Sequence, residues 1–434
     1  MPLHSHIVIV GAGPIGLALA CMIKAMNAAS GIQVLEKRVA PTRNNGLKIN
    51  ADSIEPLLKI LNQALEKLGP TGKIEHIQEL IAIFSQWKDS FIRTREIQSR
   101  LTQMAMSMGI TVLAGPQYEV TTEKLNLLLN SGGAMAAAAV STESSPLELQ
   151  KIFSEATLII GADGAHSMVR RAIMNGEEEY AEEEVLRHLI ELKFQSNSST
   201  KPRSYIMASA TSIKEGNLNF ETMGHGGTVP HKPVTVHIFV DKTTYDHFRI
   251  EDAAGNIKGT YGNSWTLKEL QNIQQPEVRA IYNQFNRYLQ DLDSRGGSCV
   301  NEEISTLQMR VYRSNRCVHL HSSGRYVFLV GDAESGLVLE RGFNKGLKGV
   351  AVCSDIIHSL TPDNIGDKLD LYAKQMKTIY DSEKSLAVLK NKALKAVESS
   401  LFFSHSCHSS SESDESDSDD EYSLGGLTAE CLLL

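Results

Sequence analysis

The feature that most constrains the fold is a glycine-rich stretch, GAGPIG at residues 11–16, between two apolar segments. The run His6–Val10 predicts a short buried strand, Pro14–Met26 a helix, and Ile32–Glu36 a second strand. A glycine turn between a strand and a helix lets the backbone approach an anion closely, and the helix start directs free N–H groups at it. The N-terminal segment therefore predicts a βαβ unit that binds the pyrophosphate of a dinucleotide.

Four residues would hold this nucleotide. Gly11, Gly13 and Gly16 have the GxGxxG spacing, and Glu36 lies 20 residues after Gly16 at the end of the next predicted strand. A carboxylate there accepts hydrogen bonds from ribose hydroxyls and disfavours the 2′-phosphate of NADPH. The pattern does not separate FAD from NAD. The alternative is a glycine turn in an α/β protein that binds no nucleotide.

The chain as a whole predicts an α/β fold, a Rossmann-type nucleotide-binding domain with an inserted antiparallel β-sheet and C-terminal helices. Short strand-like runs separated by turn residues indicate the inserted sheet. A buried strand, RYVFLVGDA, and two helices at about 344–360 and 367–397 then complete the first domain. The expected regions are 1–186 for the first part of the nucleotide-binding domain, 187–325 for the β-rich substrate domain, 326–400 for the completion with the C-terminal helices, and 401–434 for a disordered acidic tail.

Three further segments carry local expectations. The run TREIQSRLTQMAMSMGI predicts a helix, followed by a strand in ITVLAG. Residues Leu125–Leu149 are rich in Ala, Ser and Gly, which indicates irregular strands or an inserted loop. The acidic run Glu177–Glu184 is typical of a solvated helix face.

The charge distribution excludes one class of partner. The chain has a formal net charge of −8, with 51 acidic and 43 basic residues. Eight of the acids and none of the basic residues lie in 401–434, so the body of the chain is neutral. Neither part has the basic stripe of a nucleic-acid-binding protein. The six cysteines have neither zinc-site nor disulfide-framework spacing, which indicates no metal site and a reducing compartment.

Two Asp-containing turns follow predicted strands far apart in the chain. GADGAHSMVRRAI places Asp163 and Gly164 in a turn before a helix that carries Arg170, and VGDA places Gly331 and Asp332 after the later strand. Beyond the second turn, RGFNKGL offers backbone N–H groups at a helix start, at Gly342, Phe343 and Asn344. Such groups stabilise negative charge, including that on the N1–C2=O edge of an isoalloxazine ring. Taken singly, each segment also fits an ordinary turn or helix end.

The order of these motifs resembles the class A flavoprotein monooxygenases, the family with the p-hydroxybenzoate hydroxylase fold, over roughly residues 5–360. The resemblance implies one tightly bound FAD, reduced by NADPH or NADH, and the transfer of one oxygen atom to an aromatic small molecule or a protein side chain. It assigns the pyrophosphate to Gly11, Gly13 and Gly16 and the adenosine ribose to Glu36. The remaining cofactor-binding residues that it implies are Lys37, Arg43, Arg95, Asp163, Gly164, Gly331, Asp332, Gly342, Phe343 and Asn344. It implies no catalytic side chain, because the flavin carries the chemistry.

The segment ESGLVLE between the second turn and the last glycine cluster departs from the family pattern. It is shorter than the family's loop and lacks its prolines and glycine pair. This departure favours an alternative, a catalytically silent FAD-fold interaction module or a host-targeted effector. Fragments such as VLEKR and REIQSRLTQMAMSMGI also resemble the MICAL monooxygenases, which oxidise methionines on actin.

The last residues predict a lipid modification. AECLLL places Cys431 in a CaaX-like box whose final Leu favours geranylgeranylation, with an ordinary apolar end as the alternative. One prenyl chain gives only marginal membrane binding, and the acidic tail would oppose an anionic leaflet. These features predict a protein of the eukaryotic cytosol that is peripherally attached to membranes. It is either a resident protein of that cell or a secreted effector delivered into it. The oligomeric state is left open.

Overall fold

The structure, a computed structural model, describes residues 6–41, 46–68, 74–130, 145–196, 206–207, 219–223, 232–253, 255–260, 262–294, 299–337 and 340–406. It divides into two compact units. Unit 1 comprises residues 1–184 and 311–385, and unit 2 comprises residues 185–310 and 386–434. The chain passes between the units after residues 184, 310 and 385, whereas the expected boundaries were after residues 186, 325 and 400.

Unit 1 contains a six-stranded sheet of order β14-β15-β6-β1-β2-β5. Its five parallel strands are β1 (His6–Val10), β2 (Gly31–Glu36), β5 (Thr111–Ala114), β6 (Leu158–Gly161) and β15 (Tyr326–Leu329). The edge strand β14 (Val318–Leu320) is antiparallel to β15. The predicted βαβ unit and the α/β class with a parallel sheet are therefore confirmed.

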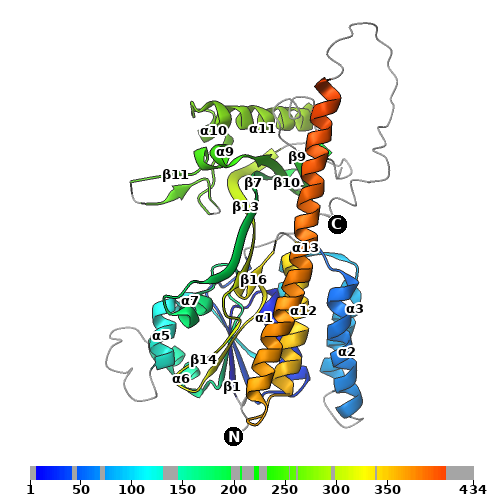
Figure 1. Cartoon of the computed structure of the whole chain (residues 1–434), viewed down its shortest axis with the longest axis vertical. Helices are drawn as coiled ribbons and strands as arrows, with labels where there is room; N and C mark the ends of the chain where they lie inside the picture. Colours follow the sequence, from blue (N-terminus) through cyan, green and yellow to red (C-terminus); the bar gives the residue numbers. More distant parts are fainter. Residues whose placement is uncertain are drawn as a thin grey trace. The chain divides into compact units, whose positions relative to one another are not determined.

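Helices cover both faces of this sheet, because alternate side chains of a strand point to opposite sides. In β1, Ile7 and Ile9 belong to one buried core and Val8 and Val10 to another. Figure 1 shows α1 and α12 on one side of the sheet and α5, α6 and α7 on the other. The first core includes residues of α1 (Pro14–Ala25), α2 (Ala51–Leu68), α3 (Ile74–Trp87), α4 (Thr94–Ser107), α12 (Glu340–His358) and α13 (Ile365–Ser406). The second includes residues of α5 (Thr122–Asn130), α6 (Ser145–Glu155) and α7 (Met168–Met174). A short antiparallel pair is formed by β3 (Gly46–Lys48) and β4 (Phe91–Arg93), and β4 contributes Ile92 to the first core.

Unit 2 contains the antiparallel strands that the sequence predicted, and a helical layer that it did not. The strands are β7 (Tyr180–Ser196), β8 (Ile206–Met207), β9 (Asn219–Met223), β10 (Lys232–Val240) and β13 (Cys299–Ser314), in the order β13-β7-β10-β9-β8. The helices are α9 (Lys242–His247), α10 (Leu267–Leu270) and α11 (Pro276–Ser294). Phe194 and Ile238 of the sheet pack in one core with Ile281 and Phe285 of α11. A small hairpin, β11 (Ile250–Glu251) and β12 (Ile257–Lys258), lies outside this sheet.

Two local expectations were wrong. The described parts of Leu125–Leu149 are helical, in α5 and α6, because Leu125, Leu129 and Leu149 bury against the sheet despite the weak local pattern. The helix α13 extends to Ser406, past the expected start of the tail at residue 401. Residues 407–434, with most of the acidic tail and Cys431, lie outside the described residues.

The acidic run Glu177–Glu184 is not a helix face, because its last residues begin β7. Three of its acids have basic partners. Glu177 pairs with Arg316 and Glu182 with Arg313 and Lys384, all distant in sequence, and Glu179 pairs with Arg170 and Arg171 of the preceding helix α7. No helix among the described residues is both long and apolar enough to cross a membrane.

A buried ion cluster lies on the sheet of unit 2. Glu191 of β7 is paired in register with His237 of β10, and its carboxylate accepts a hydrogen bond of 2.8 Å from the imidazole Nε2. Its other oxygen lies 2.5 Å from the Lys193 ammonium. Burial by itself would raise the pKa of Glu191, but the hydrogen bonds and charges of His237 and Lys193 outweigh it and lower the pKa to about 2.

We expect Glu191 to make the stability of unit 2 sensitive to acid. Because its folded pKa is depressed, its contribution is fully present above about pH 4.5 and is lost as the pH falls towards 2. At neutral pH the contribution is up to about 3 kcal/mol, at about 1.4 kcal/mol per pKa unit. Urea unfolding of Glu191→Gln between pH 2 and 7 should show a neutral-pH loss that shrinks in acid. The exposed Glu303 on β13 supplies the control, Glu303→Gln, and an equal acid response in both variants would contradict the assignment.

Candidate dinucleotide-binding site

Two of the three glycines in the turn after β1 are closely packed, and the third borders open space. Gly11 has φ +109°, and a Cβ there would lie 2.5 Å from the Ala162 carbonyl oxygen of the neighbouring turn after β6. A Cβ on Gly16 would lie 2.1 Å from the carbonyl oxygen of Gly11. A Cβ on Gly13, by contrast, would meet nothing within 4 Å. Two glycines of the motif are therefore required by the fold, and the third borders open space.

The N-terminus of α1 is left free for an anion. Gly13 is the N-cap residue, no side chain caps the helix, and Pro14 occupies its first position. The first N–H groups of a helix lack partners within it, and without a capping side chain they can bind negative charge. The loop is held by Glu36, which accepts a hydrogen bond of 3.0 Å from the Ala12 N–H, and by Gln98 of α4, which donates to the Ala12 carbonyl at 2.7 Å.

The equivalent turn after β6 is closed by its own side chains. The carboxylate of Asp163 accepts hydrogen bonds from the Ser167 hydroxyl at 2.5 Å and from the Met168 N–H at 2.7 Å. Ser167 is the N-cap residue of α7 and accepts from the Arg170 N–H at 3.0 Å. Burial raises the pKa of Asp163, while these hydrogen bonds oppose that shift. The predicted site residue Asp163 thus caps α7 with its side chain, and Gly164 lies in the same turn with an open Cβ position.

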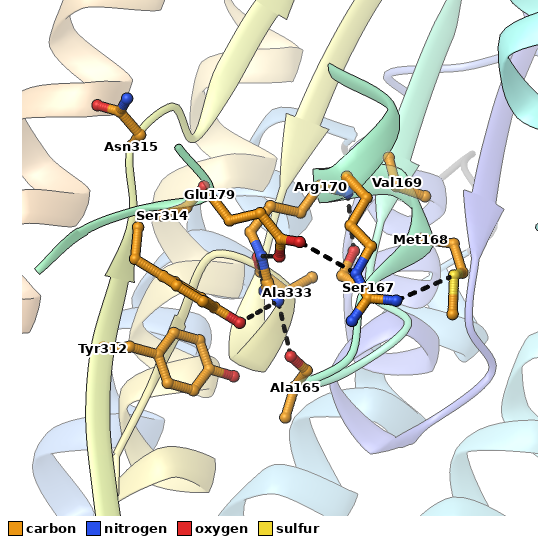
Figure 2. A network of polar contacts seen from close by, with 12 residues as sticks. Ala165, Ser167, Met168, Val169, Arg170, Glu179, Tyr312, Ser314, Asn315 and Ala333 are labelled. Atoms are coloured by element: carbon orange, nitrogen blue, oxygen red, sulfur yellow. Dashed lines mark hydrogen bonds and ion pairs between the residues drawn. The ribbon is translucent and has the colours of Figure 1, made fainter. Parts of the chain in front are cut away.

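A buried arginine connects the two Asp-containing turns. The Arg170 side chain is fully buried and donates to the Ala165 carbonyl at 2.7 Å and to the Ala333 carbonyl at 3.0 Å. It also forms an ion pair with Glu179 at 3.3 Å and donates to the Tyr180 hydroxyl at 2.9 Å. Figure 2 shows this guanidinium between the helix that carries it and the Ala333 backbone. The turn after β6 and the turn after β15 are thereby held together.

The second Asp-containing turn lies against both the glycine turn and α12. Gly331 has φ +61°, and a Cβ there would lie 3.1 Å from Ile15 of α1. A Cβ on Gly342, in the first turn of α12, would lie 3.4 Å from the Asp332 carboxylate. The structure therefore brings together seven predicted site residues: Gly11, Gly13, Gly16, Asp163, Gly331, Asp332 and Gly342.

The start of α12 differs by four residues from the expectation at about 344, because the helix begins at Glu340. Gly342 and Phe343 fall among the first four residues, whose N–H groups lack a partner within the helix, and Asn344 is the fifth. The buried Asn344 side chain instead accepts from the Asn50 N–H at 2.9 Å and donates to the Lys48 carbonyl at 2.8 Å. It ties α12 to the end of β3.

The shortened segment after the second turn contains a buried ion pair. Ser335 and Gly336 form β16, which pairs with Tyr312 and Arg313 of β13. The adjacent Glu334 lies 2.9 Å from the Lys345 ammonium of α12, and both side chains are buried.

The other predicted residues lie at the edge of this arrangement or outside it. Lys37 is exposed and pairs with Glu119 at 3.2 Å, and Arg95 is exposed in the first turn of α4. Arg43 lies outside the described residues. Sequence reasoning missed Gln98, Glu334 and Lys345 and gave Arg170 no role in the site. Their partners are distant in sequence, so only the Ser167–Arg170 spacing could have provided a local signal.

Comparison with solved structures identifies the fold. OxyS anhydrotetracycline hydroxylase from Streptomyces rimosus matches with a TM-score of 0.50 at 15% identity, over 92% of this chain and 72% of that one. The tetracycline destructase Tet(51) matches with a TM-score of 0.51 at 11% identity, over 95% of this chain and 100% of that one. The tetracycline destructase Tet(55) matches with a TM-score of 0.51 at 12% identity, over 89% of each chain. No family model and no curated protein sequence matches the chain. At these identities the likeness establishes a shared fold, the one expected from the resemblance to the class A monooxygenases.

We expect Arg170 to contribute far more to stability than its neighbour Arg171. Removal of Arg170 leaves two backbone carbonyls and Glu179 without their buried partner, which costs about 3–5 kcal/mol. Arg171 pairs with the same Glu179 at 3.1 Å but is partly exposed, so its loss should cost less than about 1 kcal/mol. Denaturant unfolding of Arg170→Ala and Arg171→Ala measures both. Equal losses would show that Arg170 does not connect the turns.

Proposed function

We propose that unit 1 binds FAD and that the chain is an NADPH- or NADH-driven, FAD-dependent monooxygenase. The observation that carries this proposal is the uncapped start of α1, open at Gly13 and backed by the Glu36 carboxylate. The fold shared with a hydroxylase supports the same class of chemistry. When bound, FAD would supply the redox chemistry that transfers one oxygen atom from O2 to a substrate.

The chain's own residues fit this cofactor. The N–H groups at the start of α1 would bind the pyrophosphate, and Glu36, whose oxygens each keep a free lone pair, would accept from the ribose. Asp332 would lie at the ribityl chain, as the resemblance implies. The N–H groups of Gly342 and Phe343 would stabilise negative charge on the ring edge.

The substrate is assigned by class only. We propose an aromatic small molecule or a protein side chain, with unit 2 as the substrate domain. OxyS is named as an anhydrotetracycline hydroxylase, which favours a small molecule over a protein side chain. His225 and His231 fall in the expected substrate domain and lie outside the described residues.

The remodelled segment between the second turn and α12 favours a second candidate, an FAD-fold interaction module without oxygenase activity. A visible absorption spectrum of the purified protein, followed by NADPH and O2 consumption, separates the two. Bound flavin with NADPH oxidation supports the enzyme. Bound flavin that no pyridine nucleotide reduces supports the interaction module. Protein that takes up no FAD contradicts the enzyme and leaves an interaction module on the same fold.

We expect Gly13→Ala to lose FAD affinity while it keeps its fold. Its Cβ would project into the open space before α1, and the extended conformation of Gly13, with φ −68°, accepts any residue. Gly366→Ala is the matched control, since a Cβ there also meets nothing within 4 Å, at the start of α13. Titration by flavin fluorescence should show at least a tenfold weaker affinity for Gly13→Ala only. Unchanged affinity in a folded Gly13→Ala variant would place the cofactor elsewhere.

Membrane attachment through Cys431 stays a prediction, as does the location in a eukaryotic cytosol as a resident protein or a delivered effector. Incubation with a geranylgeranyl transferase and its lipid donor should add one prenyl group to the wild type and none to Cys431→Ser, measured by mass spectrometry. Because one prenyl chain binds membranes marginally, the modified protein should sediment only in part with neutral vesicles. An unmodified wild type would contradict the prediction.

A further inference from the structure

The ion pair of Glu334 and Lys345 is the most completely buried pair of opposite charges in the part of the chain that the structure describes. The two side chains are 1% and 0% exposed, and their charged groups lie 2.9 Å apart. The Lys345 ammonium also donates to the Gly331 carbonyl at 3.1 Å, the Ser335 carbonyl at 2.6 Å and the Ser335 hydroxyl at 2.5 Å. The Ser335 hydroxyl in turn donates to Glu334.

Stability alone does not account for these charges. Two charges removed from water incur a desolvation cost that their attraction often fails to repay, and apolar side chains of similar volume are often as stable or more so. A buried pair is therefore weak evidence for stability. Its position is the more informative observation, because it has a specific relation to the proposed cofactor site.

The pair joins the two segments that would flank the flavin ring. Glu334 follows the Gly331–Asp332 turn directly, and Lys345 lies two residues after Phe343, in the second turn of α12. The ammonium holds the carbonyls of Gly331 and Ser335, so it fixes the backbone where the family's proline-containing loop is missing. Two opposite charges at this place cancel, and the loss of either would leave one net charge next to the ring.

We propose that Glu334 and Lys345 are positioning residues that neutralise each other's charge beside the flavin, so that neither charge alone shifts its reduction potential. This inference rests on the proposed binding of FAD to unit 1. Two-electron reduction adds negative charge to the ring, so nearby protein charge shifts the equilibrium between the oxidised and reduced cofactor. An unbalanced carboxylate disfavours reduction, and an unbalanced ammonium favours it.

The test is the midpoint potential of the FAD-loaded protein, measured by dithionite reduction against a reference dye. Lys345→Met leaves Glu334 unbalanced and should lower the potential, whereas Glu334→Gln leaves Lys345 unbalanced and should raise it. We expect at least a tenfold change in the reduction equilibrium in each case, which is about 30 mV for a two-electron couple. Lys345→Arg, which keeps the charge, and the double variant Glu334→Gln/Lys345→Met, which removes both charges, should stay near the wild type.

Each outcome decides. Shifts of opposite sign that cancel in the double variant support the inference, because a merely structural role would not reverse sign with the charge removed. Shifts of one sign, or none, overturn it while the proposed function stands. If only one single variant folds, its shift must have the sign expected for that variant, and a shift of the other sign or no shift overturns the inference. A wild type that takes up no FAD overturns the proposed function and this inference together.

Discussion

The buried guanidinium of Arg170 is the interaction on which the proposed site depends. Its two hydrogen bonds to Ala165 and Ala333 join backbone segments about 170 residues apart in sequence, the turns after β6 and β15. These strands are neighbours in the parallel sheet, but strand pairing fixes only the ends of the strands and not the turns beyond them. Arg170 supplies that constraint, with Tyr312 donating to the Asp332 carbonyl at 2.8 Å from the other side.

A second constraint is steric and comes from small residues. Gly11 and Gly16 allow the turn after β1 to pack against Ala162, and Gly331 and Gly346 allow the later turn and α12 to pack against Ile15. A Cβ on Gly346 would lie 2.6 Å from the end of the Ile15 side chain, so α12 lies close to α1 at this glycine. The elements that would bind the two ends of a dinucleotide are thus parts of one packed unit.

Much of this arrangement could be predicted from local sequence, and the remainder could not. Alternating apolar residues and the GxGxxG spacing identify β1, α1 and β2, because both signals are complete within a short window. The helix α11 also had a signal, with Val278, Ile281, Phe285 and Leu292 at helical spacing, that the reading as a pure sheet overlooked. The acidic run Glu177–Glu184, which continues into β7, had no local signal for a strand. Acids such as Glu177 pair with basic residues such as Arg316 that are remote in sequence. The roles of Arg170 and Lys345 depend in the same way on partners that only the tertiary fold supplies.

The strand–turn–helix units that follow β1 and β6 differ in how their helix starts are capped. Both follow buried parallel strands, both contain glycines, and both lead into a helix. At α7 the carboxylate of Asp163 and the hydroxyl of Ser167 occupy the first N–H groups, so the helix start is already satisfied by the chain itself. At α1 the N-cap residue is Gly13, which has no side chain to offer, and the nearest carboxylate, Glu36, bonds to the loop and not to the helix. Since the first N–H groups of a helix lack partners within it, the helix without a side-chain cap is the better candidate to bind an external anion.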